Sequence, residues 1–225
     1  MQESKNMNIV SAFIQEWILC TNSKEVLHIK TSTTNLFADL HSLKIQEIDV
    51  AQNIPKNTLY DLILGNLPFG MNSVEWNDGV KIITAQRNWL EILKSLMSLE
   101  ENGTALFLLE PLGFSTSKGV VFENELNERG FFVNAFINCP DKILLPETAI
   151  TPVLVVLSKK QTNRVFVCEL LDDSQAREVA RTYFSNRDEG NLNRGKYINV
   201  GDYSGFHRIK IKEQIERIRN PIQNL

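Results

Sequence analysis

The sequence predicts an α/β fold built on a mainly parallel sheet. Two apolar runs, at residues 62–64 and 104–109, are continuous instead of alternating, which is typical of strands buried on both faces. A segment with apolar residues at helical spacing separates them, and strands that alternate with helices form a parallel sheet covered on both faces. A chain of 225 residues with 43% hydrophobic content is long enough to bury such a core.

The N-terminal part is expected to hold one helix and three strands. Apolar side chains recur every three or four positions over residues 9–18, which predicts an amphipathic helix. Residues 25–32 and 43–50 favour strands, the second with a shorter alternation. Residues 60–66, "YDLILGN", then form a buried strand that ends at a glycine and an asparagine.

The middle of the chain continues this alternation of strands and helices. Apolar residues three or four positions apart predict a helix from about Val80 to Leu99, with a stop signal at "ENG". After the strand at residues 104–109 come a loop and a short helix through Phe122 and Leu126. Two strands without a helix between them follow, and such neighbours can pair antiparallel. We therefore expect one antiparallel strand, "PVLVVLS", at an edge of the sheet.

The C-terminal part is more polar than the rest. We expect a core at residues 1–160 and a small polar and basic extension at residues 161–225, with a strand near its start and two helices. Residues 191–225 hold seven basic and three acidic side chains, a net charge of +4, so the remainder of this chain of net charge −3 carries −7. A solvated face explains most such runs. The alternative is a patch that meets nucleic acid, for which the candidates are Arg208, Lys210 and Lys212.

Composition argues against several other protein classes. No apolar run approaches the length of a membrane span, and the first residues lack the basic and apolar segments of a signal peptide, so we expect a cytoplasmic protein without a membrane partner. The cysteines Cys20, Cys139 and Cys168 are odd in number and have no histidines at metal-ligand spacing. This pattern argues against a disulfide framework and against a metal site.

The candidate chemistry lies at the end of the strand at residues 60–66. Ligands of open parallel sheets bind beyond the carboxyl ends of the strands, and Asn66, Leu67, Pro68 and Phe69 occupy such an end. An amine conjugated to a ring attacks a methyl group more readily when two acceptors hold its hydrogens. The Asn66 side chain and a neighbouring carbonyl supply two such acceptors, and the ring of Phe69 offers a surface for stacking. A plain turn is the alternative interpretation.

The stretch "GNLPFG" is similar to the catalytic Asn-Pro-Pro-aromatic motif of S-adenosylmethionine-dependent amino-methyltransferases. "YDLILGNLPFG" most resembles the adenine-specific DNA methyltransferases of restriction-modification systems, particularly the type I modification subunits. The later segments "NWLEILKSLMSLEENGTALFLLEPLGF" and "FINCPDKILLPETAITPVLVVLSKK" are similar to segments of that family in the same order, so the resemblance covers residues 60–160. It implies a Rossmann-like methyltransferase sheet and methyl transfer to the exocyclic amine of adenine in DNA.

The resemblance also implies roles for single residues. The side chain of Asn66 and the carbonyl of Leu67 would accept the hydrogens of the target amine, and Phe69 would stack on a base swung out of the double helix. Leu67 stands where the family usually has a proline, which adds a free N–H and relaxes the backbone. The implied partners are DNA and a second methylase or specificity subunit.

The family's cofactor is S-adenosylmethionine, yet its glycine-rich turn has no counterpart here. The first glycine of the sequence is Gly65, and the later "GKYINVGDYSGF" lacks the compact spacing and the preceding buried strand. The N-terminal half of the methyltransferase sheet would then be incomplete. Asp49, in "EIDVAQNIP", stands where the family has an adenine-contacting carboxylate, and a surface aspartate in a loop is the alternative interpretation.

Several functional explanations therefore stay open. The chain is a truncated or split methylase that needs a second chain, a catalytically inactive scaffold or DNA-binding subunit, or an enzyme with an unfamiliar cofactor loop. A methyltransferase that acts on protein glutamine side chains or on RNA shares the Asn-Pro-Pro-aromatic motif, and the segment "DKILLPETAITPVLVVLSKK" favours the DNA branch.

Overall fold

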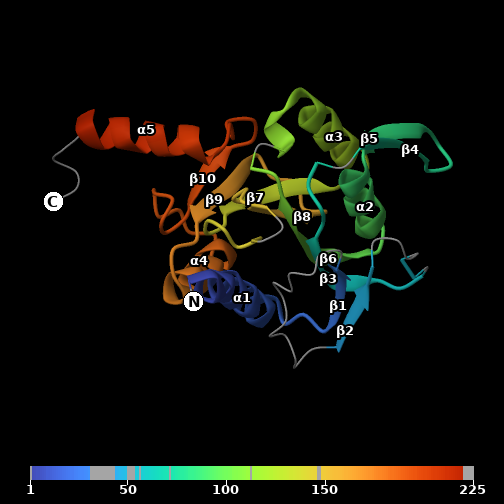
Figure 1. Ribbon diagram of the computed structural model, residues 1–225, viewed down its shortest axis with the longest axis horizontal. Coiled ribbons are helices and arrows are strands. Elements are labelled where there is room, and N and C mark those ends of the chain that lie inside the picture. The colour runs from blue at the N-terminus through green and yellow to red at the C-terminus, as the bar shows by residue number, and fades with distance from the viewer. Residues whose placement is uncertain are drawn as a thin grey trace.

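The computed structural model describes residues 2–30, 44–49, 54–55, 57–70, 72–111, 113–145 and 148–219. An eight-stranded sheet with helices on both faces forms the body, and a two-stranded hairpin stands apart from this sheet (Figure 1). The elements in chain order are α1 (Gln2–Thr21), β1 (Glu25–Lys30), β2 (Lys44–Ile48), β3 (Tyr60–Asn66), β4 (Ser73–Asn77), β5 (Ile82–Gln86), α2 (Arg87–Leu96), β6 (Leu99–Leu109), the 3₁₀ turn η1 (Gly113–Ser115), α3 (Ser117–Glu128), β7 (Phe132–Asn138), β8 (Val153–Ser158), β9 (Arg164–Glu169), α4 (Asp173–Phe184), β10 (Lys196–Asn199) and α5 (Phe206–Arg219).

The main sheet has the strand order β10-β9-β7-β8-β6-β3-β1-β2. The pairs β1–β2, β1–β3, β3–β6 and β7–β9 are parallel, which confirms the predicted α/β fold with a mainly parallel sheet. The strand "PVLVVLS" is antiparallel, as predicted, but its predicted position at an edge of the sheet is wrong. It is β8, which lies between β6 and β7 and is antiparallel to both. All six residues of β8 are buried, and a strand that is apolar on both faces packs best with a neighbour on each side. The antiparallel strand at the edge is β10.

The continuous apolar runs of β3 and β6 supply both faces of the sheet. Ile63 and Phe107 belong to a core shared with α2 and α3, whereas Leu62, Leu64 and Leu106 belong to a core shared with α1 and α4. Successive side chains of a strand point to opposite faces. The two strands are therefore buried on both faces, as their sequences predict.

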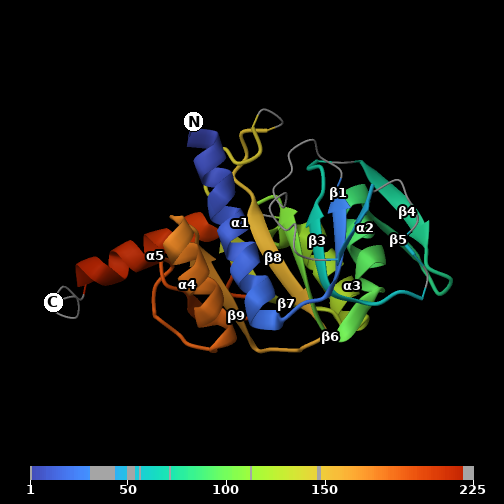
Figure 2. The same cartoon turned by 90° about the horizontal axis from the view of Figure 1, so that it is seen from below.

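Helices cover the two faces in pairs. On one face α1 and α4 lie side by side (Figure 2), where Arg181 Nε donates to Glu16 Oε1 at 2.7 Å and the rings of Trp17 and Tyr183 stack at 4.8 Å. On the other face α2 meets α3 through Trp89 and Phe122, with ring centroids 5.3 Å apart. None of the described helices is long and apolar enough to cross a bilayer.

Strands β4 and β5 form a hairpin, and its second strand lies where the spacing of apolar residues predicts the start of a helix. The helix predicted at residues 80–99 is wrong over its first part, because β5 precedes the shorter α2. At the hairpin turn Gly79 has a φ of +91°, and Asp78 Oδ1 accepts the N–H groups of Val80 and Lys81, each at 2.8 Å. The Asn-Asp-Gly turn thus outweighs the helical spacing of the apolar residues that follow it.

The chain after residue 160 joins the same layers. Strand β9 pairs with β7, β10 pairs with β9, and α4 packs on α1. The boundary expected at residue 160 falls between β8 and β9, two strands of one sheet. Helix α5 contacts the body through Phe206 and Ile209, which are buried, and its C-terminal part projects from the body (Figures 1 and 2).

Candidate active site

The strand order reverses at β1, which lies between β2 and β3. In open α/β sheets, ligands bind at such a point, outside the carboxyl ends of the strands. Lys30 and Asn66, the last residues of β1 and β3, are register partners. The tetrapeptide that begins at Asn66 therefore starts at the carboxyl ends of the strands, where a ligand is expected.

The four residues of this tetrapeptide differ in exposure. Asn66 is 4% exposed and Leu67 is 1% exposed, whereas Pro68 is exposed and Phe69 is half-buried against the core that α1 and α4 share. The carboxamide of Asn66 is thus held in a position with little access to water. An electrostatic interaction is stronger in such surroundings than in bulk water.

The loop after Asn66 is attached to the end of β6 and to α2 through Glu110 and Asn88, for which the sequence predicts no role. Gly70 has a φ of +66°, and its N–H donates to Glu110 Oε1 at 3.2 Å. The same oxygen accepts a longer bond, of 3.5 Å, from Asn88 Nδ2. Glu110 directly follows the buried strand β6. A polar residue after a buried strand indicates a position near the ligand side of the sheet, so the sequence carried a signal for Glu110. Asn88, inside a helix, gives no such signal.

Asp49 lies on the same side of the sheet as Asn66, the side formed by the carboxyl ends of the parallel strands. It directly follows β2, its side chain is exposed, and the register between β1 and β2 pairs Ile29 with Ile48. Strand β1 thus separates Asp49 from Asn66. The turn after β1, where the sequence lacks glycines, falls in residues 31–43, which lie outside the described residues.

The three basic residues proposed for nucleic acid lie on α5, beyond β10 and away from β3 (Figures 1 and 2). Arg208 and Lys212 are exposed, whereas Lys210 Nζ pairs with Glu169 Oε1 at 2.5 Å on the side of the helix that faces the body. The structure therefore does not bring these residues next to Asn66. Of the three basic side chains, Arg208 and Lys212 are thus available to an outside partner, and Lys210 is engaged within the protein.

A cavity of about 380 Å³ lies between the hairpin, α2 and α3. Its lining is mostly apolar and includes Ile83, Trp89 and Phe122, together with Ser73 from the strand that follows the Asn66 loop. The hairpin is thus a wall of this cavity, and it is also the continuation of the candidate loop.

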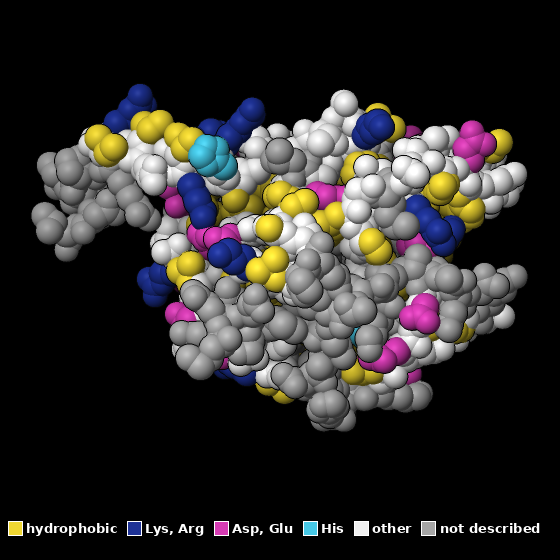
Figure 3. All heavy atoms as spheres, in the orientation of Figure 1, with side chains coloured by type: hydrophobic (Ala, Val, Ile, Leu, Met, Phe, Trp, Pro, Cys, Tyr) yellow, Lys and Arg dark blue, Asp and Glu magenta, His cyan; other side chains and the backbone are white. Residues whose placement is uncertain are grey.

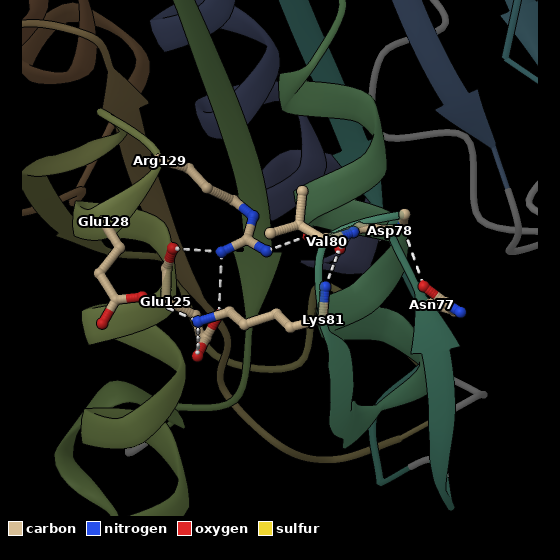
Figure 4. A network of polar contacts seen from close by, with 8 residues as sticks. Asn77, Asp78, Val80, Lys81, Glu125, Glu128 and Arg129 are labelled. Atoms are coloured by element: carbon tan, nitrogen blue, oxygen red, sulfur yellow. Dashed lines mark hydrogen bonds and ion pairs between the residues drawn. The ribbon is translucent and has the colours of Figure 1, made fainter.

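Ion pairs tie the turn of the hairpin to α3 (Figure 4). Lys81 Nζ lies 2.8 Å from both Glu125 Oε1 and Glu128 Oε2, and Arg129 pairs with Asp78. The N–H groups that bond Asp78, and the nearby Arg129, lower the pKa of its carboxyl group to about 2. The hairpin is therefore held in place by charges that are present at neutral pH.

The cysteines show no feature of a reactive site. Cys139 and Cys168 are buried and Cys20 is exposed. Burial raises the pKa of the Cys139 thiol to about 12, so that it stays protonated and is a poor nucleophile at neutral pH. Within the described ranges, no three His, Cys, Asp or Glu side chains are grouped so that they could hold a metal ion.

Several solved structures with similar folds are methyltransferases. A type I restriction-modification methyltransferase subunit from Streptococcus thermophilus aligns with 92% of this chain at 16% identity and a TM-score of 0.60. The M protein of the type I restriction enzyme EcoKI aligns with 92% at 11% identity and a TM-score of 0.53. A Listeria monocytogenes protein described as a class I S-adenosylmethionine-dependent methyltransferase aligns with 78% at 14% identity and a TM-score of 0.52.

The chain has a methyltransferase fold. The resemblance to type I modification subunits, first seen in the sequence, is confirmed at the level of the fold. The alignments cover 56% of the Streptococcus subunit, 64% of the EcoKI M protein and 68% of the Listeria protein, so the chain spans only part of these methyltransferases. No family model matches the sequence, and no curated protein matches it significantly.

Proposed function

We propose that the chain transfers a methyl group from S-adenosylmethionine to the exocyclic amine of adenine in DNA, as part of a restriction-modification methylase. The observation that carries this proposal is the position of Asn66, Leu67, Pro68 and Phe69. They begin at the last residue of β3, next to β1, where the strand order reverses. A carboxamide, a carbonyl and an aromatic ring at that edge suit an amine on a flat ring.

The proposed mechanism uses neutral acceptors. The Asn66 Oδ1 and Leu67 carbonyl oxygens accept the two hydrogens of the amine, so its lone pair is less delocalised into the ring. The nitrogen would bond to the methyl carbon as the bond from that carbon to the donor sulfur breaks, with its electron pair left on the sulfur. The two oxygens would stabilise the positive charge that develops on the nitrogen. A proton then leaves the nitrogen for water. The burial of Asn66, at 4% exposed, strengthens its part of this effect.

Phe69 would hold the ring of the substrate. One part of its side chain packs against the core, which fixes its orientation, and the rest is accessible for stacking. A base inside a duplex cannot reach such a ring, so the adenine must leave the double helix first. Base–aromatic stacking contributes about 1–3 kcal/mol per base.

S-adenosylmethionine supplies the methyl group on a positively charged sulfur. Asp49 would contact the adenosine part of this cofactor, since its exposed carboxylate directly follows β2 and can accept hydrogen bonds from the ligand. The sequence has no glycine before Gly65, so side chains limit how closely the backbone can approach the ligand. We therefore expect the isolated chain to bind the cofactor weakly or not at all in calorimetric titration, and micromolar binding would contradict this expectation.

A second chain would complete such an enzyme, and α5 offers a surface for it. Ile211, Ile215 and Ile218 are 41%, 42% and 79% exposed and recur at intervals of four and three residues. This narrow apolar stripe is typical of a seam between two helices. Figure 3 shows hydrophobic side chains along α5 with basic ones beside them. We propose a helix with acidic flanks, from a specificity or second methylase subunit, as the partner.

This partner can be tested by co-expression with candidate subunits from the same source. Replacement of the three isoleucines by serine should abolish a complex that the unaltered chain forms in size-exclusion chromatography. Replacement of the exposed Val120 and Val121 on α3 is the control, because it removes apolar surface elsewhere. Equal binding by the isoleucine variant would contradict the assignment.

The proposed activity is tested by incorporation of tritiated methyl groups into unmethylated DNA, with the chain alone and with candidate subunits. Asn66→Ala should lower incorporation by about 10²–10³-fold. Unchanged incorporation would refute the catalytic role of Asn66. Incorporation into RNA or protein glutamine instead of DNA would favour the other amino-methyltransferases, and none under any pairing would favour an inactive scaffold or DNA-binding subunit.

A further inference from the structure

Glu110 joins three elements around the candidate loop. It follows β6 directly, and its Oε1 accepts the N–H of Gly70 at 3.2 Å and Nδ2 of Asn88 at 3.5 Å. Its own carbonyl accepts the N–H of Gly113, at 2.9 Å, in the next loop. One residue at a carboxyl end thus contacts the loop after β3, the first turn of α2 and the loop that leads to α3.

The remaining oxygens of this pair are buried and receive no hydrogen bond from the part of the chain that the structure describes. Glu110 Oε2 and Asn88 Oδ1 have no hydrogen-bond partner among the described residues, and the Asn88 side chain is wholly buried. A buried acceptor that lacks a donor destabilises the folded state, and an apolar pair of similar shape would avoid that cost. Stability alone therefore does not explain this pair.

The bond to Gly70 holds the chain four residues after Asn66. Gly70 has a φ of +66°, a conformation that glycine adopts without strain. Beyond it, the carbonyl of Asn72 accepts the N–H of Arg87, at 3.2 Å, at the start of α2. The loop is thus attached to β3 at one end and to Glu110 and α2 at the other. The residues between, with the carbonyl of Leu67 and the ring of Phe69, are fixed from both ends.

We propose that Glu110, supported by Asn88, is a positioning residue for the loop that carries Asn66, Leu67 and Phe69. It acts through Gly70 and does not contact the substrate. The hydrogen bond, and not the negative charge, performs this role, since a neutral oxygen in the same place can accept from Gly70. This inference deepens the proposed methyl transfer and rests on it for its effect on the reaction.

The test compares Glu110→Ala with Glu110→Gln. The alanine variant loses the acceptor, so amide hydrogen exchange in residues 66–70 should rise, and kcat for methyl transfer should fall about 10–100-fold, because small misplacements of reacting groups have effects of that size. The KM for DNA should change less. The glutamine variant keeps an oxygen for Gly70 and should restore both the exchange rate and kcat to near the unaltered values. Glu100→Ala is the control, because it removes an exposed carboxylate of β6, the strand that Glu110 follows.

Each outcome separates this inference from the proposed function. Unchanged exchange in residues 66–70 of a folded Glu110→Ala variant would overturn the positioning role, whatever the activity. Equal losses in the alanine and glutamine variants would also overturn it, because the charge would then be the essential property. If the unaltered chain transfers no methyl group under any pairing, the proposed function fails, while the exchange comparison still decides whether Glu110 holds the loop.

Discussion

Lys30 and Asn66 are register partners at the carboxyl ends of β1 and β3, and Asp49 follows the strand on the other side of β1. The parallel pairing of three strands therefore places the candidate carboxamide and the candidate cofactor carboxylate on one edge of the sheet. Two loops distant in sequence share a side because parallel strands end together, and the proposed methyl transfer requires its donor and its acceptor amine to meet at one side.

Gly65 precedes this edge and has no room for a side chain. A Cβ built on it would lie 2.4 Å from Cδ1 of Phe107, its register partner on β6. We expect Gly65→Ala to lower the free energy of unfolding by about 1–3 kcal/mol, the usual cost of overpacking a core. Urea denaturation measures this change.

Gly113→Ala is a matched control for that substitution. Its new methyl group would meet nothing closer than Glu110 Oε2, at 3.6 Å, which is ordinary contact. Its free energy of unfolding should therefore change little. An unaltered stability of Gly65→Ala would show that Phe107 can move aside.

The hairpin should loosen in acid. The pKa of Asp78 is lowered from 3.8 to about 2 by the N–H groups of Lys81 and Val80 and then by Arg129. A carboxyl group whose pKa is lowered by folding stabilises the folded state at pH values above its pKa in the unfolded chain. This stabilisation is lost as the pH falls through the pKa of the folded state. Amide exchange in the hairpin should therefore rise as the pH falls from 3.8 to about 2, after correction for the pH dependence of intrinsic exchange.

Asp78→Asn is the matched variant, since it keeps an acceptor for the two N–H groups and removes the charge that faces Arg129. Its hairpin should exchange faster than the unaltered one at neutral pH, and the two should converge as the pH approaches about 2. A difference that stays constant over this range would exclude titration of Asp78 as the cause.

The basic residues of α5 differ in their surroundings, which makes the DNA proposal testable. Arg208 and Lys212 are exposed, whereas Lys210 is engaged with Glu169. If the exposed pair contacts phosphates, Arg208→Ala and Lys212→Ala should each weaken DNA binding and reduce the slope of log K against log salt by about 1. Lys210→Ala should leave the slope unchanged. Equal slopes for all variants would indicate a solvated face.

The pattern of buried runs was sufficient to predict the layers of this fold. Continuous apolar sequences at residues 62–64 and 104–109 gave strands that the structure buries on both faces, and the helix expected at residues 9–18 is the centre of the longer α1. The place of β8 was not predictable in the same way, since a fully apolar strand carries no information about which neighbours it pairs with. The hairpin was missed because three or four apolar residues fit a helical and an alternating pattern equally well.

The position of the candidate loop followed from sequence, but its supports did not. The sequence pointed to Asn66 because it ends a buried strand and begins a motif, whereas Glu110 also follows a buried strand but no motif assigned it a role. The bond from Gly70 to Glu110 joins two loops that only the pairing of β3 with β6 brings together. The sequence also grouped Lys210 with Arg208 and Lys212. It does not show which face of α5 packs on the body, and that face determines which of the three side chains is exposed.

Asn66 and Phe69 should separate chemistry from binding. Asn66→Ala removes one acceptor of the amine and leaves the ring in place, so the affinity for DNA with an extrahelical adenine should change little while methyl transfer falls by about 10²–10³-fold. Phe69→Ala removes the stacking surface and should weaken capture of the flipped base by about 1–3 kcal/mol. Fluorescence of 2-aminopurine at the target position reports the flipped base, and single-turnover methyl transfer at saturating DNA reports the chemical step. If the tetrapeptide is only a turn, both substitutions would change the stability of the fold, and neither would distinguish binding from chemistry.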